Sequence, residues 1–142
     1  MKLVQHLLDA KGDEIISISP DASVFDAIKL MADKAVGSLL VMENDELKGI
    51  VTERDYARKV IIKGRASDST AVGEIMTADV FTATTDQTVN QCMTLMTEKR
   101  IRHLPIVTDD GVIGLISIGD LVQAIISDQQ EEIEQLEHYI SG

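Results

Sequence analysis

Two short segments of this sequence place an aspartate three positions after a hydroxyl residue, just where an apolar segment ends. The pairs are Thr52 with Asp55 and Ser117 with Asp120, which lie 65 residues apart. At each pair we predict a buried strand that runs into a helix. The hydroxyl and the first free N–H groups then lie at the positive end of the helix, where they can hold a phosphate group. The carboxylate one turn into the helix can accept two hydrogen bonds, which suits the cis-diol of a ribose.

The same residues also fit a purely structural role. Thr52 and Ser117 can be helix N-caps, with Asp55 and Asp120 as acidic partners in a variant of the capping box, which usually carries Glu or Gln. Two copies in register favour ligand binding over capping alone. The two roles are compatible with each other.

Composition limits the class of protein. The chain has 142 residues, 44% of them hydrophobic, which is enough for one compact domain or two small fused repeats. No apolar run approaches the ~18 residues of a membrane-spanning helix and the first residues lack a signal-peptide pattern, so we expect a soluble, cytoplasmic protein. Cys92 is the only cysteine, and we interpret it as a buried small hydrophobe. Three scattered histidines and this cysteine have no metal-ligand spacing, so we expect no metal site.

The formal net charge is −11, which argues against nucleic acid or an anionic membrane as the main partner. Most of the basic residues lie near the two predicted junctions: Arg54, Arg58, Lys59, Lys63, Arg65, Lys99, Arg100 and Arg102. Arg54 is placed unfavourably for the helix dipole and is therefore a candidate phosphate contact. We interpret Arg58, Lys59 and Lys63 as the solvated face of a helix.

Hydrophobic periodicity and turn residues divide the chain into short elements. We predict helices over 2–8, 24–34 and 53–63, strands over 15–18, 39–42 and 47–52, and a turn at 11–13. The expected organisation is a first repeat with an N-terminal helix (1–64), a linker (65–71), a second repeat (72–128) and an acidic C-terminal helical extension (129–142).

The two halves are copies of one another. They align over 50 positions without a gap, from Ile15 paired with Val80 to Gly64 paired with Gln129. Identical pairs include Val24/Val89, Leu39/Leu104, Gly49/Gly114 and Asp55/Asp120, and residues 72–76 repeat the pattern of residues 4–8. We therefore predict an α+β protein with two β-α-β-β-α repeats related by a pseudo-two-fold axis, plus a C-terminal helical extension.

Over residues 4–128 the chain resembles a pair of cystathionine β-synthase (CBS) domains. The resemblance lies in the tandem repeat and in the ending of each half: a glycine, two aliphatic residues, Thr or Ser, two variable residues and Asp. It implies binding of adenosyl ligands, which include AMP, ADP, ATP, S-adenosylmethionine and NAD(H), in clefts between the repeats. It also implies a homodimer.

Carried over residue by residue, the resemblance implies a set of ligand contacts. Asp55 and Asp120 would bind ribose hydroxyls; Thr52 and Ser117 would bind phosphate; Ile16, Ser17, Phe81 and Thr82 would meet adenine through the main chain of the first strand of each repeat; Arg102 and His103 would line the phosphate end. The copies differ, because Glu53 and Arg54 align with Ile118 and Gly119, and Gly37 and Ser38 align with Arg102 and His103. Gly119 leaves room for close backbone approach, and we expect the second site to bind nucleotide better.

The helical pattern continues from about Ile118 to Ile140, with Ile126, Ile133, Leu136 and Ile140 on one stripe. Such a stripe on an acidic helix indicates self-association or docking on another protein, and packing against the chain's own first helix is the alternative. We expect a non-enzymatic sensor of adenine nucleotides, the alternative being a structural or assembly module that binds no nucleotide. An enzyme is the weakest class, because no nucleophile–base pair or glycine-rich phosphate loop is present.

Overall fold

The computed structural model describes residues 2–12 and 14–141, which form two compact units. The first, here called the repeat-1 unit, comprises residues 14–81 and 109–112. The second, the repeat-2 unit, comprises residues 82–108 and 113–141 together with the N-terminal residues 2–12. Asp13, part of the predicted turn at 11–13, and Gly142, the end of the predicted extension, lie outside the described residues.

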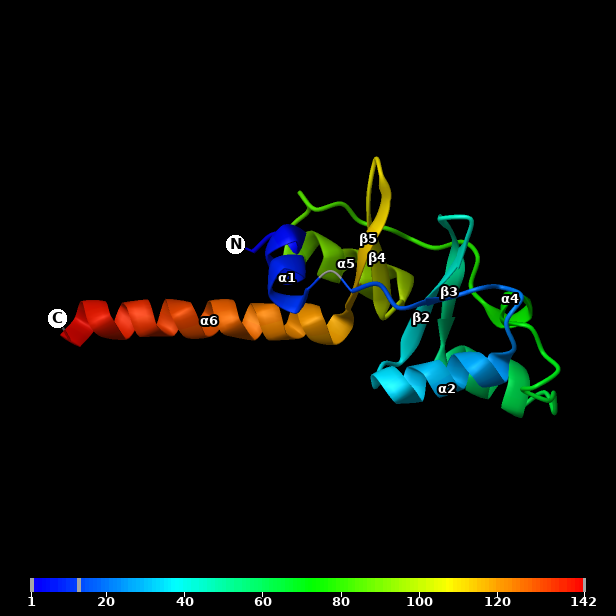
Figure 1. The fold of residues 1–142 in the computed structure, drawn as a ribbon. Helices are drawn as coiled ribbons and strands as arrows, with labels where there is room; N and C mark the ends of the chain where they lie inside the picture. Colours follow the sequence, from blue (N-terminus) through cyan, green and yellow to red (C-terminus); the bar gives the residue numbers. More distant parts are fainter. Residues whose placement is uncertain (1, 13, 142) are drawn as a thin grey trace. The chain divides into compact units, whose positions relative to one another are not determined.

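The repeat-1 unit contains a three-stranded sheet in the order β1-β2-β3, formed by β1 (Ser17–Ile18), β2 (Ser38–Glu43) and β3 (Glu46–Thr52). β1 pairs with β2 in parallel, and β2 pairs with β3 in an antiparallel hairpin that is visible in Figure 1. The turn between β2 and β3 places Asn44 and Asp45 at φ 52° and 64°. Two successive left-handed residues match the twist of a tight hairpin, which explains the Asn-Asp pair.

Helix α2 (Val24–Lys34) covers this sheet because its apolar residues recur at helical spacing. Val24, Ala27 and Met31 are buried in one cluster with residues of β2 and β3. The helix begins at Ser23, whose side chain accepts a hydrogen bond from the backbone N–H of Asp26 at 3.1 Å. The predicted helix at 24–34 is confirmed.

The predicted helix at 53–63 is not a regular α-helix. α3 covers only Glu53–Tyr56, and a π-helical segment, η1 (Ala57–Ile61), follows it. The N–H of Ile62 donates to the carbonyl of Ala57 at 3.1 Å, which is the five-residue spacing of a π-turn. Val60, within η1, is fully buried, and sequence periodicity alone does not reveal the wider turn.

The repeat-2 unit contains α1 (Val4–Lys11), α5 (Val89–Lys99), β4 (His103–Thr108), β5 (Gly111–Ser117, whose first two residues belong to the repeat-1 unit) and α6 (Ile118–Ser141). β4 and β5 form a two-stranded sheet. The expected strand at Phe81–Thr82 is wrong. Only Ala83 pairs with β4, through its N–H to Pro105 O at 3.0 Å and its carbonyl to Val107 N–H at 2.9 Å.

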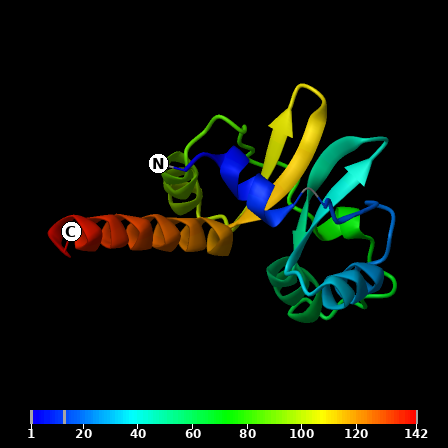
Figure 2. The same ribbon diagram turned by 60° about the vertical axis from the view of Figure 1, so that its left-hand side comes forward.

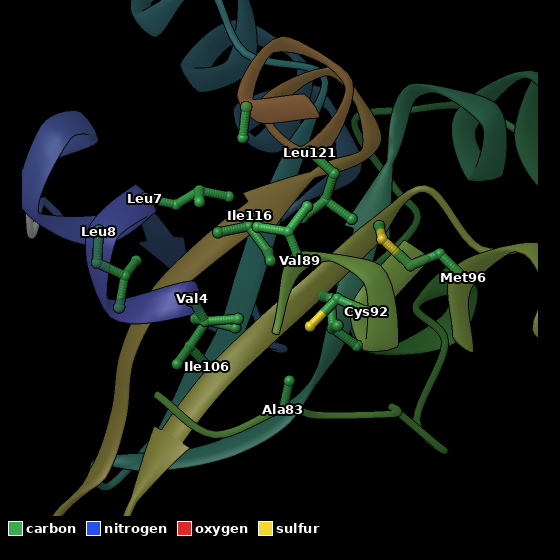
Figure 3. Close-up of a cluster of buried hydrophobic side chains, with 12 residues drawn as sticks. Val4, Leu7, Leu8, Ala83, Val89, Cys92, Met96, Ile106, Ile116 and Leu121 are labelled. Atoms are coloured by element: carbon green, nitrogen blue, oxygen red, sulfur yellow. The ribbon is translucent and has the colours of Figure 1, made fainter. Parts of the chain in front are cut away.

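Each short helix that precedes a repeat packs in the other unit. α1 places Val4, Leu7 and Leu8 in the repeat-2 core, beside Ile106 and Ile116 (Figure 3). Its counterpart α4 (Val72–Ile75) places Val72 and Ile75 in the repeat-1 core. Equivalent backbone bonds hold both segments, from Val89 N–H to Lys2 O at 3.0 Å and from Val24 N–H to Thr70 O at 2.8 Å.

The glycines shared by the two repeats lie where these short segments pass over a strand. A Cβ atom at Gly49 would meet Thr77 O at 2.5 Å, and one at Gly114 would meet Leu8 Cδ2 at 2.7 Å. Both distances are shorter than carbon atoms allow without movement, so glycine permits the close approach. This packing explains why both halves of the chain carry glycine at this position.

Candidate functional site

The Ser117–Asp120 junction joins the end of β5 to the start of α6. Asp120 Oδ2 accepts a hydrogen bond from the backbone N–H of Ser117 at 2.8 Å, and Ser117 Oγ accepts one from the backbone N–H of Asp120 at 3.1 Å. This reciprocal pair is a capping box with Asp in place of Glu. The predicted capping role is confirmed, and the junction is also the N-terminus of a 24-residue helix.

Lys11, at the end of α1, also binds Asp120. Its Nζ lies 2.7 Å from Asp120 Oδ2 and donates to Leu115 O at 2.8 Å. Partial burial alone would raise the pKa of Asp120, but hydrogen bonds from Lys11 and from the Ser117 N–H, with the Lys11 charge, bring it below its ordinary value. Asp120 is therefore held as a carboxylate.

Arg102 and His103 lie at the same corner. The N–H of Ile118 donates to the carbonyl of Arg102 at 2.9 Å, which ties the start of β4 to the start of α6. Burial lowers the pKa of His103, and the charges of Lys11 and Arg102 lower it further against the opposing effect of Asp120. The structure thus brings together the predicted residues Ser117, Asp120, Arg102 and His103.

The Thr52–Asp55 junction repeats this arrangement with different neighbours. Thr52 N–H and Oγ1 both donate to Asp55 Oδ2, at 3.0 and 3.1 Å, and Thr52 Oγ1 accepts from Asp55 N–H at 3.1 Å. Lys59 Nζ lies 3.1 Å from Asp55 Oδ1 and also donates to Ile75 O at 2.8 Å. Both oxygens of Asp55 therefore have partners within the repeat-1 unit.

Lys59 corrects the interpretation of residues 58–63 as a solvated face. Its side chain is half-buried and bridges α3 to α4, whereas Arg58 and Lys63 are exposed as expected. Lys11 was not predicted as a site residue at all. Lys59 lies four residues after Asp55, a helical spacing that could have predicted the Lys59–Asp55 ion pair. Nothing in the repeat alignment points to Lys11.

The other predicted site residues are distributed over both units. Arg54 is exposed on α3, and Gly119 is exposed on α6, where an added Cβ would meet only Ser117 Oγ at 3.6 Å. Ile16 is half-buried, and its carbonyl accepts from Leu40 N–H at 3.2 Å, next to exposed Ser17. Phe81 and Thr82 are exposed, the first in the repeat-1 unit and the second in the repeat-2 unit.

Other chemistry finds little support in the part of the chain that the structure describes. Cys92 is fully buried, as predicted, and burial raises the pKa of its thiol, which disfavours a reactive thiolate. Among residues 2–12 and 14–141, no group of His, Cys, Asp or Glu side chains is arranged to hold a metal ion. Within the same residues, no helix is both long enough and apolar enough to cross a bilayer.

Two copies of one strand–helix unit, each with a capping-box aspartate at the start of its helix, define a protein built from a tandem repeat. The sequence profile of the CBS domain matches residues 11–62 and 72–127. The chain belongs to the CBS domain family, as the resemblance in its sequence predicted, and the α+β fold with two repeats and a C-terminal helix is confirmed.

Known relatives cover most of the chain. It is 47% identical over 127 residues to the mitochondrial CBS domain-containing protein CBSX3 of Arabidopsis thaliana, a match to 86% of this chain but only 62% of that protein. A solved CBS-domain protein from Burkholderia ambifaria is 50% identical, with a TM-score of 0.87 over 90% of this chain and 96% of the other. The CBS domain pair of protein MJ0100, solved with 5′-methylthioadenosine and S-adenosyl-L-methionine, is 25% identical, with a TM-score of 0.80 over 90% and 98% of the two chains.

Proposed function

We propose that this protein is a non-enzymatic sensor that binds an adenosyl ligand, such as AMP, ADP, ATP or NAD(H), at the Ser117–Asp120 junction. The observation that carries this proposal is the ion pair of Lys11 with the carboxylate of Asp120 at a helix N-terminus, to which the backbone of Arg102, next to His103, is hydrogen-bonded. A lysine from a separate helix on the capping aspartate exceeds what a capping box needs. These groups suit a ligand that presents both a diol and an anionic group.

The proposed contacts follow from the donors and acceptors present. The two ribose hydroxyls donate to Asp120, and the Ser117 hydroxyl with the free N–H groups of α6 meets phosphate. Lys11 already contacts Asp120 Oδ2, so a diol on that oxygen would compete with it. A displaced Lys11 Nζ is free to pair with the ligand's phosphate, at the end of the site where Arg102 and His103 lie.

The Thr52–Asp55 junction is proposed as the weaker site. Asp55 is occupied by Thr52 and Lys59, and Gly37 and Ser38 stand where the second copy has arginine and histidine. Arg54 is proposed to contact phosphate from exposed α3. Ile16, Ser17, Phe81 and Thr82 are proposed to meet the adenine. Complexes of MJ0100 with two adenosyl compounds support the ligand class.

A sensor must bind its ligand with different affinity in two conformations. We propose that ligand binding is signalled by a change in the position of α1, because Lys11 joins the end of that helix to Asp120. We also propose that the protein is a homodimer. We propose a cytoplasmic location. The similar Arabidopsis protein is mitochondrial, so fractionation of the source cells is the test of this location.

The experiment is a thermal-shift panel on nucleotide-stripped protein, followed by calorimetry. The panel contains AMP, ADP, ATP, NAD⁺, NADH, S-adenosylmethionine and 5′-methylthioadenosine, with GTP as the base control. A ligand that binds only the folded state stabilises it by about 2.7 kcal/mol at a hundredfold excess over Kd. Shifts with adenosyl compounds and none with GTP are expected. No shift with any compound would refute the sensor.

The second candidate function is an assembly module whose aspartates only cap helices. The completeness of both capping boxes favours it, because each aspartate already has a structural partner without any ligand. It predicts no response in the panel and a change of oligomeric state when exposed apolar residues of α6 are replaced.

A further inference from the structure

The second half of α6 is a helix without a protein core to cover it. Leu121 and Ala124, near its start, are buried in the repeat-2 unit, whereas residues 129–141 are all exposed. Figures 1 and 2 show this part of α6 extending past α1 and α5. Packing of an apolar face contributes most of the stability of a helix in water, so a partner helix would stabilise this segment.

The exposed apolar residues follow a heptad pattern. Ile126, Ile133 and Ile140 recur every seven residues, and Val122, Gln129 and Leu136 recur at the same interval between them. These are the a and d positions of a coiled coil, respectively. The apolar members of this seam are 44–82% exposed, with Ile140 the most exposed.

We propose that α6 pairs in parallel with α6 of a second copy of this chain to form a two-stranded coiled coil over residues 122–140. The inference refines the proposed homodimer and rests on it. Isoleucine at every a position, with Leu136 at one d position, favours two parallel strands, and the other two d positions carry Val122 and Gln129. Gln129 argues for an identical partner, because a side-chain amide can donate to and accept from its own copy across the seam, whereas an apolar partner would leave it unpaired.

The flanks of the seam set the strength of this pairing. In a parallel pair Glu132, at g, faces Glu137 of the second copy, at e. Two exposed pairs of like charge oppose pairing only weakly beside the burial of the apolar seam. The remaining acidic residues of the segment, Asp128, Glu131 and Glu134, lie at outward positions c, f and b.

Cysteine cross-linking tests the seam. In a Cys92→Ala background, with alanine as at the equivalent Ala27, Ile133→Cys is expected to form an interchain disulfide under mild oxidation at least tenfold faster than Glu134→Cys. A mixture of Ile126→Cys and Ile140→Cys proteins should yield only same-position disulfides. Equal rates at 133 and 134 would refute the seam, and 126-to-140 disulfides would refute the parallel direction.

Charge reversal provides a second test by sedimentation equilibrium. Glu132→Lys converts both flanking pairs to opposite charges, so the dimer Kd should fall about three- to tenfold, whereas Glu131→Lys should change it less than twofold. An unchanged or higher Kd for Glu132→Lys would overturn the parallel register. A wild-type protein that is dimeric but shows no preferred cross-link refutes the coiled coil alone, and a monomer refutes the homodimer as well.

Discussion

Replacing Asp120 by asparagine separates helix capping from ligand binding. Asparagine has the same shape and keeps a carbonyl oxygen that can accept the Ser117 N–H now bound at 2.8 Å. The substitution removes the ion pair with Lys11. The side chains of Lys11 and Asp120 are 45% and 30% exposed, and an ion pair with this exposure contributes about 0.2–1 kcal/mol to stability. We therefore expect Asp120→Asn to lower the melting temperature by only a few degrees.

The same substitution should have a larger effect on binding. A ribose diol needs two acceptors, and the asparagine amide offers one oxygen and a donor. Loss of one charge-assisted hydrogen bond costs about 1.5–3 kcal/mol, which corresponds to about a 10- to 150-fold rise in Kd. Isothermal titration calorimetry measures this with the tightest adenosyl ligand of the panel.

Asp55→Asn is the matched control for this experiment. Its capping box is equally complete and its carboxylate is more buried, so its thermal shift should be at least as large. Its effect on the Kd of the tight site should be within twofold. If Asp120→Asn changes the melting temperature as expected but leaves Kd unaltered, Asp120 is a cap and the ribose contact is refuted.

The remaining predictions concern stability and are measured by urea unfolding. Gly49→Ala should cost about 2–4 kcal/mol because the new methyl group would lie 2.5 Å from a backbone oxygen; Gly114→Ala should cost less because it meets a movable leucine side chain, and equal costs would contradict the packing. The pKa of Asp120 is lowered in the folded state, so the stability that its ionised form contributes is complete above the ordinary value of 3.8 and is lost as pH falls through the folded pKa. The difference in free energy of unfolding between wild type and Lys11→Met should therefore shrink over that pH range. A difference that stays constant with pH would refute the linkage. Ala35 has φ 56°, so Ala35→Gly should stabilise the protein by about 0.5–1 kcal/mol, and a loss of stability would contradict this.

Most of the fold could be predicted from the sequence because the duplication presents the pattern of each element twice. Helices α2 and α5 are each capped by a hydroxyl side chain, Ser23 and Thr88, and bury equivalent faces, and Gly49 and Gly114 mark the same close approach in both units. The π-turn after Tyr56 could not be predicted, because a widened turn leaves the apolar spacing almost unchanged. The packing of α1 in the repeat-2 core and of α4 in the repeat-1 core could not be predicted either. The apolar pattern of an amphipathic helix shows which side faces a core, but it does not show which core that is.

The candidate site was predictable where its residues are adjacent in sequence and not where packing of α1 supplies them. Thr52 with Asp55 and Ser117 with Asp120 form local capping boxes, and Lys59 follows Asp55 at helical spacing. The second repeat has Ala124 at the position of Lys59, so an alignment of the halves predicts that Asp120 has no lysine. It has Lys11 instead, 109 residues away in sequence, because α1 packs against the start of α6. Both aspartates therefore pair with a lysine, but Lys59 comes from the same helical segment as Asp55 and Lys11 comes from α1. At Asp120 the lysine itself belongs to a separate helix, α1, so competition for the carboxylate there acts directly on that helix.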